Sequence, residues 1–334
     1  MSEPESNLAF EVQKEVRAPW RRYLDALAPM RPSLHRYCCR LTGSVWDGED
    51  LMQDTLLRVF GLLGKIDRDL EHPRAYFIRT ATHLWIDQQR RLARDRAWRA
   101  EQSALSTAAD GTATSPNTAE HDAGLHQAAR SFLHRLAPRE RAAFLLREVL
   151  DLSTEDAAAV LQISEGAVKS ALHRGRGRLD GEPAVATEGP LPSRELVERF
   201  LTAMAGNDMA TMQAICSADL AVELVGGARS DTFKESASFF KHANMVFPPS
   251  MEAIARKMVL GTDPHWRPQE YRGEWIVLGF RTFDGVDGLN EVHRLDEVDG
   301  KIARIRCYCF CPDTLQALAD EIGVTAHRKP YRSP

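Results

Sequence analysis

The stretch from Leu152 to Leu179 reads LSTEDAAAVLQISEGAVKSALHRGRGRL, which predicts two short helices separated by a tight turn. Ser153 can cap the first helix, with Asp156 three residues later in the manner of a capping box, and Ser164 can cap the second. Apolar residues at helical spacing supply the contact between the helices: Ala157, Val160, Leu161, Ile163, Val168, Ala171 and Leu172. The segment is therefore predicted to be a helix-turn-helix.

The second helix of this motif has a polar and mainly basic outer face. Its outward positions comprise Ser164, Glu165, Lys169, Ser170, His173 and Arg174, continued by Arg176 and Arg178. Such a surface suits base edges and phosphates in a DNA major groove. The alternative is a structural helical hairpin whose basic face is only solvated. Gly175 and Gly177 each disfavour a helix by up to ~1 kcal/mol relative to alanine, which predicts that this helix ends early.

The composition is that of a globular protein with two or three domains. The 334 residues are 43% hydrophobic and 27% charged, and no stretch approaches the ~20 apolar residues that a membrane helix needs. The N-terminal sequence also lacks the pattern of a secretion signal. We therefore expect a cytoplasmic protein without membrane contact, in which the six cysteines are thiols.

The distribution of charge says more than its sum. The net charge of −4 would by itself argue against a nucleic-acid-binding protein. However, residues 73–100 contain seven arginines against two aspartates, and residues 166–179 contain four Lys/Arg and no acid. Local basic stretches on an acidic background indicate DNA contacts at defined places and protein contacts elsewhere.

A segment with an acidic face, DGEDLMQDTLLRVF, occupies residues 47–60. Helical spacing predicts one core face made of Leu56, Val59, Phe60 and Leu63. A second face groups Asp50, Asp54 and Leu57 close to the acids Asp47 and Glu49. This second face could dock onto a protein partner, and the alternative is a solvated acidic surface.

A mixed aromatic and basic segment follows, PRAYFIRTATHLWIDQQRRLARDRAWR, beginning at Pro73, which can occupy the first turn of a helix. Tyr76, Phe77 and Trp85 alternate with arginines, a combination that suits single-stranded nucleic acid because rings stack on bases and guanidinium groups hold phosphates. The alternative places Phe77, Ile78, Leu84, Trp85 and Ile86 in the core and leaves the arginines solvated.

The chain divides into three predicted domains. Residues 1–102 are helical, residues 103–124 form a small polar linker, and residues 125–181 contain the helix-turn-helix. A second linker, residues 182–192, leads to an α+β domain over residues 193–327. The helices of that domain are predicted at Arg194–Ala205 and Met209–Ile215, and its strands at Ala221–Val225, Glu274–Phe283, Leu289–Glu297 and Ile302–Phe310.

Taken in order, the three helical segments resemble the extracytoplasmic-function sigma factors over roughly residues 20–179. The resemblance implies RNA polymerase core and promoter DNA as partners, with the clamp bound by Asp50, Leu51, Asp54 and Leu57. It implies that the minus-10 strand is bound by Arg74, Tyr76, Arg79, His83, Asp87, Arg90 and Arg91. It implies that the minus-35 element is read by the outer-face residues given above, Ser164 to Arg178, while the surrounding region sits on the polymerase flap.

The C-terminal domain resembles a SnoaL-like domain, a cone of helices against a curved mixed sheet. Catalytic relatives of this fold hold a ligand in the cone, and the polar residues available here are His242, Asp263, His293 and Asp296, whose spacing marks no dyad. Cys307, Cys309 and Cys311 would share one face of a strand. We expect them in the core, with a metal or redox site that includes His293 as the alternative.

These inferences favour a sigma factor that initiates transcription and is not an enzyme, with no catalytic residue, metal or cofactor of its own. The fused C-terminal domain is expected to regulate this activity through an intramolecular contact with the sigma domains. Two alternatives remain open. One is a free-standing helix-turn-helix regulator, and the other is an enzyme or ligand sensor built on the C-terminal cone.

Overall fold

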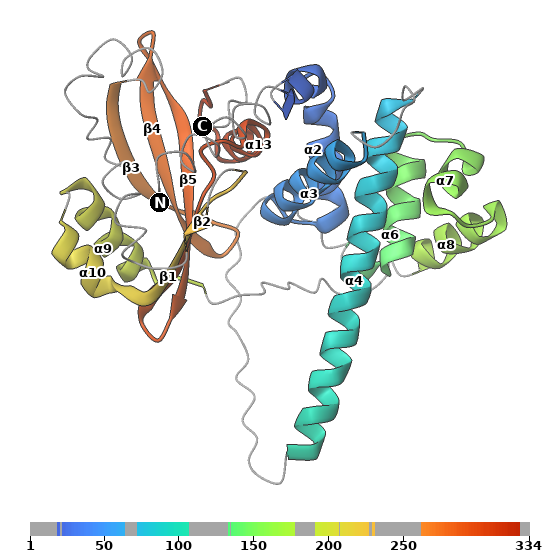
Figure 1. Cartoon of the computed structure of the whole chain (residues 1–334), viewed down its shortest axis with the longest axis horizontal. Coiled ribbons are helices and arrows are strands. Elements are labelled where there is room, and N and C mark those ends of the chain that lie inside the picture. Colours follow the sequence, from blue (N-terminus) through green and yellow to red (C-terminus); the bar gives the residue numbers. More distant parts are fainter. Residues whose placement is uncertain are drawn as a thin grey trace, which may run out of the picture. The chain divides into compact units, whose positions relative to one another are not determined.

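The computed structural model describes residues 19–20, 22–63, 72–106, 133, 135–177, 191–206, 208–226, 229–230 and 262–327 (Figure 1). The chain forms two compact units, one spanning 30–186 and the other combining 1–29 with 187–334. The two predicted helical domains thus pack mainly as one body, and their separate boundaries remain predictions. The predicted linker at residues 107–124, the second linker up to residue 190, Arg178 and His242 lie outside the described residues. Within the described part, no helix combines the length and the apolar character needed to cross a membrane.

The first unit consists of helices. Their bounds are α2 Arg31–Thr42, α3 Val45–Leu63, α4 Pro73–Ser106, α6 Pro138–Phe144, the π-helix η1 Leu145–Val149, α7 Thr154–Leu161 and α8 Glu165–Gly177.

The helices α2, α3 and α4 share one apolar core. Leu41, Met52 and Phe77 are almost completely buried in it, and the Tyr37 hydroxyl hydrogen-bonds to Thr82 Oγ1 at 2.7 Å, which joins α2 to α4. The predicted burial of Phe77, Ile78, Trp85 and Ile86 is confirmed, whereas Leu84 is only partly buried. These rings and branched chains therefore hold the helices together and are not available for stacking on bases.

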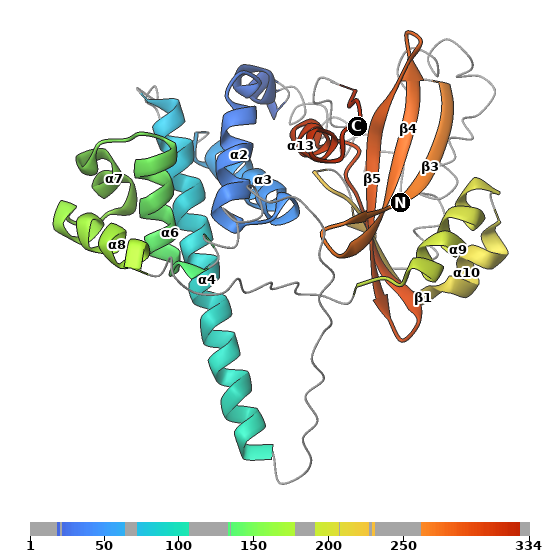
Figure 2. The ribbon, with the colours of Figure 1, turned by 180° about the vertical axis from the view of Figure 1, so that it is seen from behind.

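The helix α4 is longer than its packed part. Its N-terminal half lies among the other helices, whereas its C-terminal half projects beyond them as a single rod (Figures 1 and 2). The helix continues to Ser106, four residues into the stretch predicted as linker.

The helix-turn-helix forms as predicted. The Asp156 backbone N–H donates to Ser153 Oγ at 2.9 Å, and Ser153 Oγ donates to the Asp156 carboxylate at 2.7 Å. Gln162 then takes a left-handed conformation (φ 55°) that ends α7 and turns the chain toward α8. The expectation that α8 ends early was wrong, since it runs to Gly177. A Cβ at Gly175 would lie 3.3 Å from Leu136 Cδ2, so a small residue suits the close packing there.

The second unit is an α+β domain, which confirms the predicted class. Helices α9 Arg194–Ala205 and α10 Met209–Ile215 match their predicted bounds. The strands are β1 Cys216–Leu224, β2 Arg229–Ser230, β3 Thr262–Tyr271, β4 Glu274–Phe283, β5 Val286–Val298 and β6 Lys301–Cys307, followed by α13 Pro312–Ile322. The sheet order is β2-β1-β6-β5-β4-β3, with β1 and β6 parallel and the other pairs antiparallel.

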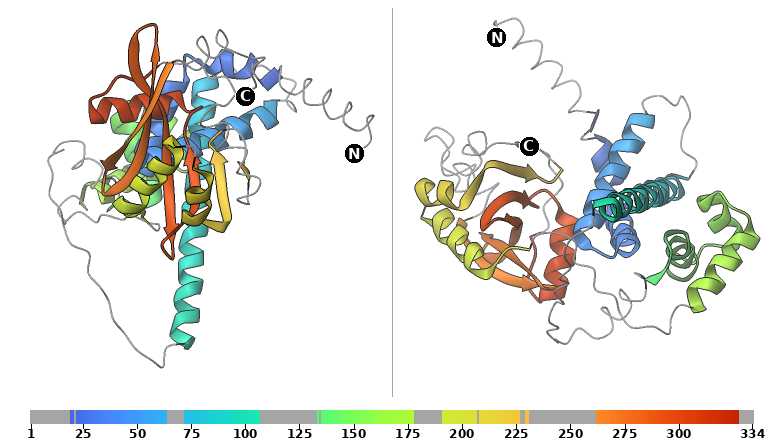
Figure 3. Two further views of the ribbon diagram at one scale, coloured as in Figure 1. Left: turned by 90° about the vertical axis from the view of Figure 1, so that its left-hand side faces the viewer. Right: turned by 90° about the horizontal axis from the view of Figure 1, so that it is seen from below.

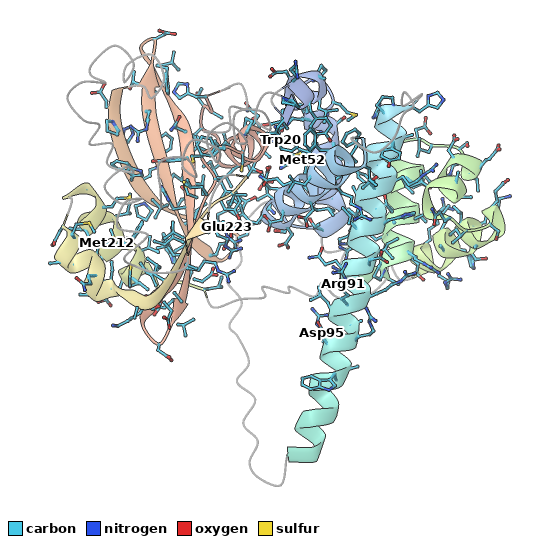
Figure 4. The ribbon with its side chains drawn as sticks, in the orientation of Figure 1. Trp20, Met52, Arg91, Asp95, Met212 and Glu223 are labelled. Carbon is cyan, nitrogen blue, oxygen red and sulfur yellow. The ribbon has the colours of Figure 1, made fainter. Side chains whose placement is uncertain are left out.

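The helices α9 and α10 cover one face of this strongly curved sheet (Figure 3). Their apolar side chains share a core with β1, β4, β5 and β6, in which Val197, Phe200 and Leu220 are 0% exposed. Met212, labelled in Figure 4, belongs to the same core. Among the described residues, the side of the sheet toward α9 and α10 is therefore lined mainly by apolar side chains.

Two sequence expectations about the strands need correction. The strand β3 was not anticipated, because its polar composition and Pro268 are atypical of a strand; β3 is a sheet edge, where a residue without an N–H is tolerated. The strand β6 ends at Cys307, because the chain turns at Cys309 and Phe310 to begin α13 at Pro312. Cys307, Cys309 and Cys311 therefore do not share one strand face.

Candidate nucleic-acid interface

The outer face of α8 presents the predicted recognition residues to solvent. Ser164, Glu165, Lys169, Ser170, His173, Arg174 and Arg176 are all exposed. The apolar side of the same helix is buried, with Val168 at 0% and Ala171 at 2% exposure. Ser164 Oγ accepts from the Ala167 backbone N–H at 3.2 Å and caps the helix. The local sequence thus fixes which side of α8 remains free to enter a groove.

Two arginines of α8 are held by acids of the same unit. Arg174 Nε donates to Glu140 Oε1 at 3.0 Å, and Arg176 Nη2 donates to Glu148 Oε1 at 3.0 Å. The Arg174 side chain is still 58% exposed while Glu140 is buried. The Arg176–Glu148 pair is exposed on both sides, and exposed pairs are worth ~0–1 kcal/mol, so a phosphate could replace Glu148 as the partner of Arg176.

The predicted minus-10 residues lie along α4 and differ in accessibility. Tyr76 is half-buried and His83 is only partly exposed, whereas the other members of the set are exposed: Arg74, Arg79, Asp87, Arg90 and Arg91. Arg90 Nη1 also pairs with Asp87 Oδ1 at 3.1 Å, one turn away. Exposed arginines therefore remain along this helix, as the charge distribution predicted.

Sequence reasoning missed one exposed aromatic on α4. Trp98 is 61% exposed on the projecting half of the helix, beyond Arg91 and Asp95, which Figure 4 labels. Its position among Arg94, Arg96 and Arg99 in the sequence was the available signal. An exposed aromatic ring on a helix that also carries exposed arginines is suited to stack on unpaired bases.

His83 is engaged within the helical unit. Its Nε2 lies 2.8 Å from the Val160 carbonyl oxygen of α7, so a predicted minus-10 residue is bound to the first helix of the helix-turn-helix. Arg141 of α6 makes a second link, because Nη1 donates to the Leu41 carbonyl at 3.0 Å and the guanidinium lies 5.3 Å from the centre of the Trp85 ring. Burial lowers the pKa of Arg141 to about 10.

The acidic face of α3 is only partly as predicted. Asp47, Asp50 and Asp54 are exposed, and partial burial raises the pKa of Asp54. Leu57 is 57% exposed beside them, which is unusual for a leucine on a helix of a packed domain. Leu51, in contrast, is 3% exposed and supports the helix from the core, so it offers no contact surface in this conformation.

Glu49 belongs to the interior. It is 0% exposed, its carboxylate accepts from Gln53 Nε2 at 2.8 Å, and it lies 3.5 Å from His35 Nε2. The acidic docking face therefore consists of Asp47, Asp50 and Asp54 with Leu57.

The polar residues singled out in the C-terminal domain are not brought together. Asp263 is exposed, and Asp296 pairs with Arg306 at 2.8 Å. His293 is 1% exposed and lies instead beside Glu291, which sequence reasoning did not single out. Burial would raise the pKa of Glu291, but His293, Arg281 and Trp266 outweigh it and lower this pKa to about 2.

Comparison with known families assigns the helical part. The Sigma-70 region 2 family matches residues 27–95, and the Sigma-70 region 4 family matches residues 126–179. The RNA polymerase sigma-E factor of Streptomyces avermitilis is 32% identical over 172 residues, which are 51% of this chain and 84% of that protein. The ECF RNA polymerase sigma factor SigD of Mycobacterium tuberculosis is 31% identical over 48% of this chain and 77% of its own length. This chain belongs to the ECF sigma factors.

The resemblance drawn from the three helical segments is thereby confirmed. ECF sigma factor SigJ of Mycobacterium tuberculosis is 31% identical over 198 residues, 57% of this chain and 61% of that protein. The chain covers less than two thirds of SigJ and of the SigE factor of Mycolicibacterium smegmatis, of which it spans 55%. Sigma factors as a family bind RNA polymerase and promoter DNA, and they are not enzymes in the catalytic sense.

The similarity to solved structures is weaker, with low sequence identities and low TM-scores. The crystal structure of Mycobacterium tuberculosis SigJ is 20% identical, covers 87% of this chain and 98% of that chain, and has a TM-score of 0.32. An NTF-2 like protein of Burkholderia xenovorans is 15% identical over 41% of this chain and 84% of its own, with a TM-score of 0.26. The description of the C-terminal unit as α+β thus depends on its own helices and sheet.

Proposed function

We propose that this ECF sigma factor directs RNA polymerase to specific promoters, reads the minus-35 element with α8 and the minus-10 strand with α4, and assists strand opening. The observation that carries the proposal is the outer face of α8, where every predicted recognition residue among those described is exposed while the opposite face is buried. Family membership makes promoter DNA the natural partner of such a face.

The helices α8 and α4 would bind different parts of the promoter, α8 the duplex and α4 the separated strand. Basic side chains such as Arg174 and Arg176 set the position on the phosphate backbone, and Lys169, Ser170 and His173 reach base edges in the major groove. On α4 the exposed arginines would hold the backbone of the separated strand. Capturing an unstacked base costs a few kcal/mol, which stacking on Tyr76 or Trp98 would offset.

The polymerase contact is proposed for the α3 face of Asp47, Asp50 and Asp54 with Leu57. An exposed leucine with aspartates on the same helix face suits a partner surface that combines an apolar pocket with basic residues. We assign this partner surface to the clamp of RNA polymerase. The helix-turn-helix region would sit on the flap. The polymerase supplies the chemistry, so the sigma chain needs no catalytic group of its own, and its place of action is the cytoplasm.

The packed helical unit is proposed to open on the promoter. Elements named minus-10 and minus-35 are about 25 base pairs apart, or ~85 Å at ~3.4 Å per base pair. A compact unit of about 150 residues has a radius of gyration of ~15 Å, which is too small to present α4 and α8 to both elements at once. The links of His83 to Val160 and of Arg141 to Leu41 would therefore break when polymerase holds the two regions apart.

The C-terminal unit is proposed to regulate this opening. It has its own core and sheet, so it can act as a separate body on the sigma regions through an intramolecular contact. The enzyme alternative is less well supported, because Asp263 and Asp296 do not face His293. The free-standing regulator alternative leaves the exposed Leu57 and its acidic neighbours without a partner.

In vitro transcription tests the proposal. Core polymerase lacking sigma is mixed with genomic DNA and the full-length chain, a chain ending at Asp180, or full-length Lys169→Ala. The full-length chain or the shortened one should start transcripts at a common promoter motif, and Lys169→Ala should weaken initiation at that motif. A difference between the two chain lengths would give the sign of regulation. Absence of specific initiation from folded protein of either length would favour the free-standing regulator.

A further inference from the structure

Three side chains of different chemistry converge inside the C-terminal sheet. His293 of β5 and Cys307 of β6 are direct cross-strand partners, and Glu291 precedes His293 by two residues on β5. Because side chains alternate along a strand, Glu291 and His293 point to the same face, and cross-strand partners do so too. The register alone therefore brings a carboxylate, an imidazole and a thiol together.

The distances between these groups match a shared ligand. One carboxylate oxygen of Glu291, one ring nitrogen of His293 and Cys307 Sγ all lie within 4.8 Å of one another. His293 Nε2 is 3.7 Å from Glu291 Oε1, which is longer than a hydrogen bond. The three residues are 7%, 1% and 2% exposed, in the order Glu291, His293, Cys307, so solvent does not serve as their partner.

In the described part of the chain, the His293 ring has only a long polar contact to its neighbour, between Nε2 and Glu291 Oε1. Neither Nδ1 nor Nε2 has a hydrogen bond from the described residues, although the ring is almost fully buried. A buried polar group without a hydrogen bond is costly and rare in native structures. The ring also packs near Phe200 of α9, with centroids 6.4 Å apart, and one of its nitrogens lies within 4.8 Å of both Glu291 and Cys307.

The surroundings orient the carboxylate. Trp266 Nε1 donates to Glu291 Oε1 at 2.8 Å, an outer hydrogen bond of the kind that fixes metal-binding carboxylates. Gly279 lies between these two residues in the sheet, and a Cβ there would be 2.4 Å from Glu291 Cγ and 2.9 Å from Trp266 Cδ1. Glycine at this position thus makes room for the side chains that the proposed site requires.

We propose that Glu291, His293 and Cys307 bind a divalent cation of the zinc class. Thiolate, imidazole and carboxylate are the ligands that Zn²⁺ takes, whereas Mg²⁺ and Ca²⁺ prefer all-oxygen sites. Three protein ligands leave a fourth position for water or a small ligand. On binding, the Cys307 thiol gives its proton to solvent as the sulfur–metal bond forms.

One nearby charge opposes the cation. Arg281 Nη2 lies 3.9 Å from Glu291 Oε1 and is buried, so Glu291 is already partly neutralised. The Cys307 thiolate supplies the negative charge that compensates the metal, which makes this residue the decisive ligand. Cys311 is not a member of the site, since its Sγ is directed to the Val225 carbonyl at 3.6 Å. The site departs from the expectation that the chain holds no metal.

Cobalt substitution on the full-length chain tests the site. The protein is purified with a chelator, dialysed under reducing conditions and titrated with Co²⁺, whose thiolate charge-transfer and d–d absorption bands report sulfur ligation and tetrahedral geometry. We expect one equivalent of Co²⁺ per chain, displacement by Zn²⁺, and a higher melting temperature of the C-terminal unit with Zn²⁺ because the metal binds the folded state.

Matched serine variants separate ligation from folding. Cys307→Ser should lose the thiolate band, whereas Cys311→Ser, another buried cysteine, should keep it. Glu291→Gln should weaken Co²⁺ binding at least tenfold while retaining the band at saturating metal. The proposal fails if folded wild-type protein gives no thiolate band, or if Cys307→Ser retains the band with full stoichiometry. If Cys307→Ser does not fold, Glu291→Gln with unchanged affinity would equally overturn it.

Discussion

The helix α8 and the strand β5 carry similar side chains but present them in opposite directions. On α8, Glu165 and His173 are exposed, whereas on β5, Glu291 and His293 are buried. An exposed polar face can meet a macromolecule without desolvation beforehand, and a buried polar cluster must find its partners inside the fold. The same residue types therefore indicate DNA recognition in one region and a small bound ion in the other.

The difference follows from which residues bury the side chains of each element. A helix buries one stripe set by its own sequence, so the outward residues of α8 can be derived from local spacing. A strand obtains its environment from neighbours that are distant in sequence, and β5 lies between β4 and β6 with helices packed on the sheet. Whether a polar residue on β5 is exposed cannot be decided locally.

The largest expected effect contrasts two adjacent leucines of α3. Leu56 is 3% exposed and Leu57 is 57% exposed. Leu56→Ala should lower the free energy of unfolding by about 3 kcal/mol, through lost burial and a cavity, while Leu57→Ala should change it by less than ~0.5 kcal/mol. Urea denaturation followed by circular dichroism measures both.

The same pair then separates stability from partner binding. Leu57→Ala should weaken core polymerase binding about tenfold, corresponding to ~1.4 kcal/mol, in a fluorescence anisotropy titration. Equal affinity of wild type and Leu57→Ala would show that the acidic face of α3 is only solvated.

The next effect concerns the recognition face of α8. The double variant Lys169→Ala and His173→Ala should reduce initiation at the native promoter about 100-fold, since each base contact is worth ~1–3 kcal/mol. Arg139→Ala, an exposed arginine on α6, is the matched control and should leave initiation within twofold. An equal loss in both proteins would mean that only general basic charge matters.

A smaller effect tests the link between α6 and α2. Arg141→Ala removes the donor to the Leu41 carbonyl and the cation above Trp85, and should lower the free energy of unfolding by about 2 kcal/mol. Arg139→Ala on the same helix should be neutral. If the link restrains opening, Arg141→Ala should also increase the distance between fluorescent labels placed on α3 and α8. An unchanged distance distribution would remove that role.

The smallest effect is the loss of one helix cap. Ser153→Ala deletes the acceptor for the Asp156 N–H and should cost about 1 kcal/mol, with Ser153→Asp restoring most of it. Thermal unfolding of the three proteins measures the difference. A neutral Ser153→Ala would show that tertiary packing alone sets the start of α7.

The sequence predicted most of what local spacing controls. The caps of α7 and α8, the exposed face of α8, the bounds of α9 and α10 and the limits of β4 all depend on residues within a few positions of one another. The starts of both helices of the helix-turn-helix could be placed to the residue, because Ser153 and Ser164 precede segments whose apolar positions repeat with the period of a helix.

Local spacing was not sufficient where residues distant in the sequence determine whether a side chain is buried. The burial of Leu51, which the resemblance implied as a clamp contact, depends on the packing of α2 and α4 around α3 and could not be derived from local spacing. Glu291 was not singled out, because its burial and its proximity to Cys307 depend on the pairing of β5 with β6. The edge position of β3, which makes Pro268 acceptable, is likewise a property of the whole sheet.

The length of α4 has a consequence for how it melts. Its 34 residues rise about 50 Å at ~1.5 Å per residue, and side chains from Arg90 to Trp98 are exposed. The packed first half supplies the helical nucleus, so the second half needs only propagation and depends on local propensity. It should therefore lose order residue by residue from Ser106 inward on warming. Amide exchange along α4 would show a gradient of protection and not one cooperative step.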